Sequence, residues 1–151
     1  MISLDTNLLL YARKEGNPFH TKARSFLEKC SASNEVVIAE LVLVEFYVAL
    51  RNPAIMDAVL SPEEAVAECQ IFSRHPRWQL AENAEVMTRV WKTAAQPNFA
   101  RSRIFDLRIA KTLQAFGVTR FATANTKDFE GMGFKEVLNP LLHDEWFSDP
   151  S

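Results

Sequence analysis

Four separate segments of the chain each place an acidic or amide side chain where it could take part in chemistry. The first is Asp5, which ends the short apolar run of residues 1–4 and directly precedes the helix-starting pair Thr6-Asn7. In a parallel α/β sheet, ligands bind outside the carboxyl ends of the strands, and Asp5 would stand at that edge. The alternative is a plain helix N-cap, a position that suits Asp well.

The second acid, Glu45, is the single charge in the apolar run of residues 41–50. At roughly 100° per residue, Leu41, Val42, Val48 and Ala49 all lie within about 60° of it. An acid on this apolar face is costly to bury, so it needs a cation or a basic partner. The structural alternative is a buried pair with an arginine such as Arg51.

The third acid, Asp106, lies in the first turn of a helix expected from Arg103 to Phe116, where the helix dipole favours negative charge. That favourable position is a sufficient structural explanation by itself. However, Ile109, Ala110 and Leu113 share the face of Asp106, so the acid points along the packed side.

The fourth group follows a late strand and consists of Thr123, Asn125 and Asp128. Any of the three could merely cap the turn that follows. Several carboxylates in one pocket repel one another unless protons are shared or a divalent cation neutralises them. Oxygen ligands without His or Cys suit Mg²⁺ or Mn²⁺, and the three histidines show no ligand spacing. There is no glycine-rich phosphate loop and no nucleophile elbow around a serine.

The elements that must position these acids alternate between strand and helix, without a hairpin dipeptide between strands. This alternation predicts an α/β fold with three layers, α/β/α, around a central, mostly parallel sheet of four to five strands. Ser61-Pro62-Glu63-Glu64 is a capping box with proline at the first helical position. Asn17-Pro18 and Asn83 are the expected starts of two further helices, and Gly117 suits the position just after the Asp106 helix. We expect strands at residues 1–4, 35–38, 78–80, 118–123 and 134–138, and helices at 17–30, 39–51, 62–74, 83–95 and 103–116.

The 151 residues fit one domain, which we place at 1–142, followed by a polar and acidic tail at 143–151. A formal charge of −2 excludes a protein that holds nucleic acid by bulk charge. Cys30 and Cys69 match no metal spacing and are expected to be reduced. No export signal or membrane-spanning run is present, so the expected compartment is the cytoplasm.

In order along the chain, four motifs resemble a PIN-domain ribonuclease, and most of all the VapC-type toxin of bacterial toxin–antitoxin pairs. The resemblance covers roughly residues 1–141. Its motifs are Leu4-Asp5-Thr6-Asn7, the Glu45 helix ending in Leu50-Arg51-Asn52-Pro53, Phe105-Asp106-Leu107-Arg108-Ile109-Ala110, and Ala122-Thr123-Ala124-Asn125-Thr126-Lys127-Asp128-Phe129 followed by Val137-Leu138-Asn139-Pro140.

The resemblance implies that Asp5, Glu45 and Asp106 bind a metal ion. Many relatives have an acid where this chain has Asn125, so either Asn125 or Asp128 would complete the site. The implied reaction is hydrolysis of RNA phosphodiester bonds assisted by Mg²⁺, with Mn²⁺ as a substitute and Glu45 as a candidate base. Single-stranded RNA is the expected substrate, because its phosphates reach a recessed pocket more easily than those of a duplex.

Other residues and partners have supporting roles in this hypothesis. Thr6 and Thr123 would position water or phosphate, and Arg101 and Arg103 would contact phosphate. A VapB-type antitoxin and a second copy of the chain are the implied protein partners. The alternatives are a catalytically weak scaffold that binds RNA or protein, and a haloacid-dehalogenase-like phosphatase with Asp5 as nucleophile. The phosphatase is disfavoured because residue 7 is Asn where such sites usually carry a second acid.

Overall fold

A parallel sheet forms the centre of the protein, and the computed structural model describes it over residues 1–143. β1, β4 and β5 pair in that order, and β2 pairs with β3. A parallel bridge between Ile2 and Val36 joins the two ladders, which confirms the expected mostly parallel sheet of four to five strands. The strands are β1 (Ile2–Leu4), β2 (Val37–Ala39), β3 (Gln79–Ala81), β4 (Arg120–Ala122) and β5 (Glu136–Leu138).

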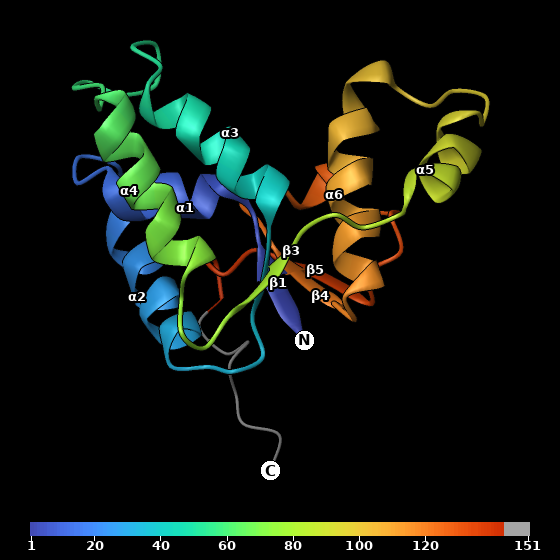
Figure 1. Ribbon diagram of the computed structural model, residues 1–151, viewed down its shortest axis with the longest axis horizontal. Helices are drawn as coiled ribbons and strands as arrows, with labels where there is room; N and C mark the ends of the chain where they lie inside the picture. Colours follow the sequence, from blue (N-terminus) through green and yellow to red (C-terminus); the bar gives the residue numbers. More distant parts are fainter. Residues whose placement is uncertain (144–151) are drawn as a thin grey trace.

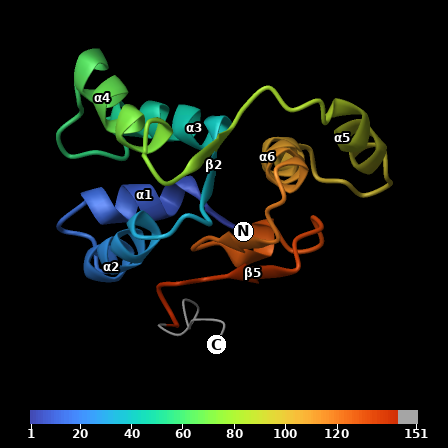
Figure 2. The same ribbon diagram turned by 60° about the horizontal axis from the view of Figure 1, so that its bottom comes forward.

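Helices cover this sheet on both sides. Helices α1 to α4 lie on one side of it, and α5 and α6 lie on the other (Figure 1; Figure 2). Since both faces are covered, β1 and β2 are buried at every residue, as is usual for parallel strands. The helices are α1 (Thr6–Arg13), α2 (His20–Ser31), α3 (Glu40–Leu50), α4 (Pro62–Ser73), α5 (Met87–Ala94) and α6 (Ile104–Ala115), with the short 3₁₀ helices η1 (Arg101–Arg103) and η2 (Thr126–Asp128).

Local sequence signals set several of these boundaries. Ser61 and Glu64 form the expected reciprocal capping box at the start of α4. Gly117, just after α6, has a φ of +84°, a conformation that favours glycine. The Phe121 ring in β4 stacks on the Phe134 ring and packs against the Phe129 ring, with centroid distances of 5.1 and 4.4 Å. These contacts pack the segment between β4 and β5 against the core.

Two expected helix starts were wrong. Asn83 does not cap α5: its φ is +57°, and the helix begins only at Met87. Asn17 accepts a hydrogen bond from the Phe19 amide at 2.8 Å, so it closes a turn before α2 begins at His20. Asparagine side chains stabilise tight turns as well as caps, which explains both errors. The strands are also shorter than expected.

No helix within residues 1–143 is long and apolar enough to span a membrane. The tail predicted for residues 143–151 lies, apart from His143, outside the described residues.

Candidate active site

Asp5 and Thr123 meet because their strands are neighbours in the sheet. Leu4 pairs with Ala122, so the next residue of each strand emerges at the same carboxyl edge. The Thr123 hydroxyl donates to Asp5 Oδ2 at 2.7 Å, and the Thr6 amide donates to Oδ1 at 2.8 Å. Asp5 therefore does both things that its sequence position allows, because it caps α1 and stands at the strand edge.

Asn7 connects the same two segments, a role that the sequence analysis did not identify. Its amide nitrogen lies 3.3 Å from both Asp5 Oδ2 and Thr123 Oγ1, and its carbonyl oxygen accepts from the Ala124 amide at 3.2 Å. The signal was present in the Asp-Thr-Asn triplet, but nothing local to it indicates residues 123 and 124 as partners.

Glu45 reaches the site from α3, which begins directly after β2. The Thr6 hydroxyl donates to Glu45 Oε2 at 2.8 Å, so Thr6 connects the Asp5 and Glu45 carboxylates through its amide and its hydroxyl. The expected apolar burial is only partly correct, because Val48 is 59% exposed and Glu45 is half-buried. Arg51 is not its partner, since that guanidinium donates to Tyr47 Oη at 3.0 Å.

Asp106 is half-buried in the first turn of α6, with Ile109, Ala110 and Leu113 buried below it. Burial, and after it the charges of Asp5, Glu45 and Asp128, together raise the pKa of Asp106 to about 6 against a smaller opposing effect of Arg103. The helix dipole should lower this pKa, so burial and the neighbouring acids outweigh it.

The pKa of Asp5, which is more buried than Asp106, is also raised. Burial raises the pKa of Asp5 to about 6 although the Thr123 and Thr6 hydrogen bonds lower it, and the charges of Glu45 and Asp128 add to the rise. The charges of carboxylates from four segments thus act on Asp5 and Asp106, of which Asp5 is buried and Asp106 half-buried.

The fourth position and the two arginines lie at the outer side of this cluster. Asn125 and Asp128 are both exposed, Asn125 before η2 and Asp128 at its end. Arg101 is exposed in η1, whereas Arg103 is half-buried and donates to the backbone carbonyls of Asp128 and Glu130. Arg103 is therefore already engaged within the protein.

The donor set fits a hard divalent ion in chemistry and in charge. Its ligands are oxygens only, and two of its acids carry a pKa raised by burial and mutual repulsion, which a cation would relieve. Within residues 1–143, however, no three acidic, His or Cys side chains are close enough to hold an ion together. Mg²⁺ commonly takes only one or two protein carboxylates and keeps several waters, so this arrangement remains suited to it.

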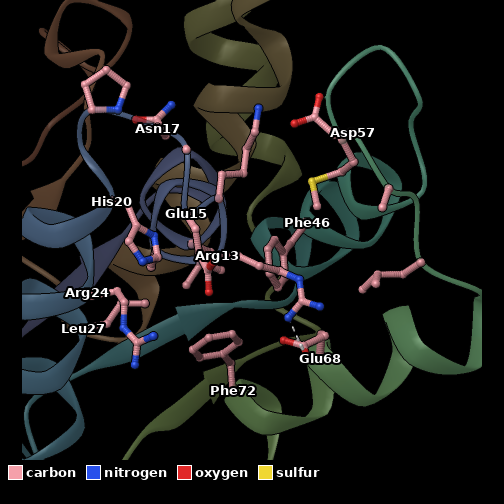
Figure 3. A pocket seen from close by; sticks show the side chains of 18 of the residues that line it. Arg13, Glu15, Asn17, His20, Arg24, Leu27, Phe46, Asp57, Glu68 and Phe72 are labelled. Carbon is pink, nitrogen blue, oxygen red and sulfur yellow. Dashed lines mark ion pairs between the residues drawn. The ribbon is translucent and has the colours of Figure 1, made fainter.

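A second feature, separate from the acids, is a pocket of about 990 Å³ between α1, α2, α4 and the loop after α3 (Figure 3). Leu27, Phe46 and Phe72 give it an apolar wall, and Arg13 pairs with Glu68 across it at 2.9 Å. None of the four candidate acids lines this pocket.

Sequence comparison connects the chain with a known protein family. The family model described as the PIN domain matches residues 2–135. Ribonuclease VapC24 of two Mycobacterium tuberculosis strains is 46% identical over 144 residues, covering 95% of this chain and 99% of the relative. Ribonuclease VapC48 of the same species is 22% identical over 141 residues, covering 91% and 97%. The chain therefore belongs to the PIN-domain family, among its VapC-type ribonucleases.

Solved structures show the same fold at low identity. The chain is similar to M. tuberculosis VapC20, a toxin that cleaves the sarcin-ricin loop, with a TM-score of 0.58, 18% identity, and coverage of 80% of this chain and 87% of that one. It is similar to FitAcB from Neisseria gonorrhoeae with a TM-score of 0.59, 19% identity, and coverage of 93% and 98%. FitAB bound to an IR36 DNA fragment gives a TM-score of 0.56, 19% identity, and coverage of 93% and 96%.

Proposed function

We propose that the protein is a metal-dependent endoribonuclease and the toxin of a toxin–antitoxin pair. The observation that supports this best is the electrostatic coupling of Asp5 and Asp106, each with a pKa near 6 and neither in an ion pair within the described residues. Such a pair of acids is suited to holding Mg²⁺, or Mn²⁺ in its place, next to an RNA phosphate. The proposed compartment is the cytoplasm, where RNA substrates are present.

In the proposed mechanism each side chain has a separate task. Asp5 and Asp106 would hold the ion, while Glu45 and Asp128 would contact it through water. When bound, the ion lowers the pKa of a water and stabilises charge on the scissile phosphate. Thr6 orients Glu45, the candidate base, and Thr123 and Asn7 hold Asp5.

Substrate contacts come from the outer side of the cluster. Arg101, which is exposed, is proposed to contact a phosphate, and the Asn125 carbonyl oxygen, also exposed, is proposed as a further metal or water ligand. A recessed cluster of this kind favours single-stranded or looped RNA over a regular duplex.

The test is cleavage of a panel of structured RNAs by the purified protein, with Mg²⁺, with Mn²⁺ and with EDTA. Asp5→Asn should abolish cleavage, and Glu63→Gln, an exposed acid on α4, is the matched control and should not. Binding of RNA without any cleavage would indicate the scaffold function instead. Release of phosphate from small phosphomonoesters would indicate the phosphatase.

For the antitoxin, we propose that the pocket of Figure 3 is the docking surface. A pocket with an apolar wall and an ion pair across it suits a peptide segment that carries apolar side chains next to polar ones. Leu27→Glu should prevent co-purification of a small partner protein and leave the melting temperature within a few degrees of wild type. Unchanged co-purification would contradict this location.

For the homodimer, exposed Val44 and Val48 on α3 and Phe105 on α6 offer the apolar surface. Val44→Lys with Val48→Glu should convert a dimer to a monomer in size-exclusion chromatography with light scattering. A wild-type protein that is monomeric at micromolar concentration would contradict the proposal.

A further inference from the structure

The loop that carries Asp128 is fastened to α6 and its preceding turn by side chains. The Arg103 Nη2 atom donates to the carbonyl oxygens of Asp128 and Glu130, each at 3.1 Å. Further along, Lys111 Nζ and Gln114 Nε2 donate to the Met132 carbonyl at 3.3 and 2.9 Å. The carbonyl oxygens of Asp128, Glu130 and Met132 thus all accept hydrogen bonds from side chains of residues 103–114.

The two ends of this attachment differ in what they hold. At the far end, Met132 is buried, so apolar packing adds to the hydrogen bonds of Lys111 and Gln114, and Phe129 is buried between the two carbonyls that Arg103 holds. At the near end, Asp128 is exposed, and within the described residues its carboxylate accepts no hydrogen bond. Its position therefore depends on its backbone, which the buried Phe129 ring anchors on one side and which Arg103 binds through hydrogen bonds to its carbonyls.

Arg103 is also poorly placed to bind a substrate phosphate. The guanidinium is half-buried, and one of its terminal nitrogens is shared between two carbonyls. Moving it onto a phosphate would leave both carbonyls without that donor, which opposes the exchange. Arg101, two residues earlier and exposed, carries no such contact within residues 1–143.

We infer that Arg103 is a positioning residue, which holds Asp128 at the acidic cluster by fastening the 128–130 backbone to the start of α6, three residues before Asp106. This inference rests on the proposed nuclease function and replaces the phosphate contact expected for Arg103. The planar, permanently charged guanidinium suits this task, because it presents fixed donors to neighbouring acceptors.

The first experiment is a double-mutant cycle on RNA cleavage with Arg103→Met and Asp128→Asn. If Arg103 acts through Asp128, Arg103→Met should lower kcat about tenfold with little change in KM. The double variant should then be no slower than Asp128→Asn alone. Arg103→Lys, which keeps the charge and some donors, should recover part of kcat.

Gln114→Met is the matched control, since it removes a donor to the same loop at the end remote from Asp128. It should lower the melting temperature as much as Arg103→Met does and leave kcat per folded molecule unchanged. Additive losses in the cycle, or a rise in KM with kcat retained, would show that Arg103 binds RNA and would overturn the inference.

The second measurement is independent of activity and uses the metal-free protein. Arg103→Met should accelerate hydrogen–deuterium exchange in peptides covering residues 125–131 and leave peptides of α3 unchanged. Unchanged exchange in 125–131 would overturn the positioning role even if cleavage is lost. If wild-type protein cleaves no RNA while exchange responds as expected, the proposed function fails and the structural role of Arg103 stands.

Discussion

The acidic cluster and the pocket beside α4 differ in whether their charged side chains form ion pairs. In the pocket, Arg13 forms an ion pair with Glu68 at 2.9 Å. In the cluster, Asp5 and Glu45 accept hydrogen bonds from neutral hydroxyl and amide groups, while their negative charges raise the pKa of Asp106. The acids of the cluster have no such partner within the described residues, which supports the proposal that an external cation balances their charge.

The largest effect that separates the two regions is expected from Asp106→Asn. Removing this charge should lower kcat for RNA cleavage by about 100-fold or more, because one of the two carboxylates proposed to bind the ion is lost. Capture of the small partner protein through the pocket should be unchanged. Parallel cleavage and pull-down assays on one preparation measure both, and loss of capture would mean that the two regions are not separate.

Thr123→Val tests how the cluster is held together. The buried hydroxyl donates to Asp5 and accepts from the Asn125 amide at 3.0 Å, so its loss leaves polar groups without partners. We expect a loss of about 1–3 kcal/mol in the free energy of unfolding, measured by urea titration. Thr88→Val, on an exposed face of α5, is the control. Equal stability of both variants would contradict the network.

A pH series sharpens the comparison through the two raised pKa values. Each acid moves from an ordinary 3.8 to about 6 on folding, so the folded protein binds more protons than the unfolded chain. The metal-free protein therefore loses stability through these groups as pH rises from about 4 to about 6, and the full cost remains above that range. Consequently Mg²⁺ should raise the melting temperature by several degrees at a pH of about 7.5 and by less at about 5. A double Asp5→Asn, Asp106→Asn variant should show neither dependence, and an equal Mg²⁺ shift at both pH values would contradict the prediction.

The smallest effect is expected in the pocket, from Glu68→Gln. Both partners of its ion pair with Arg13 are partly exposed, so breaking it should change the unfolding free energy by only about 0–1 kcal/mol. Cleavage should be unaffected. Chemical denaturation and the cleavage assay measure the two quantities, and a drop in kcat would connect the pocket to the cluster.

The sequence predicted best those features whose cause is local. The Ser61–Glu64 capping box and Gly117 after α6 depend on a few neighbouring residues, and both were confirmed. The parallel sheet followed from the alternation of elements. Asn83 failed because one residue type suits both a helix cap and a left-handed turn, and only the packing of the following segment decides between them.

Within the candidate site, the acids were predictable and their connections were not. Asp5, Glu45 and Asp106 could be identified because each is an acid in an apolar or strand-end setting. The bridge from Asn7 to Ala124 and the contacts of Arg103 with the 128–130 backbone join residues that are far apart in the chain. Such contacts depend on sheet order and register, which a residue pattern does not specify.

The sheet order has a consequence for synthesis of the protein. The first strand, β1, pairs along its whole length with β4, which comes late in the chain, and β4 is in turn flanked by β5. A growing polypeptide that has left the ribosome only as far as α5 carries Asp5 and Glu45 but has neither Asp106 nor Thr123. A chain ordered in this way therefore lacks the complete acidic cluster until most of its length has been translated.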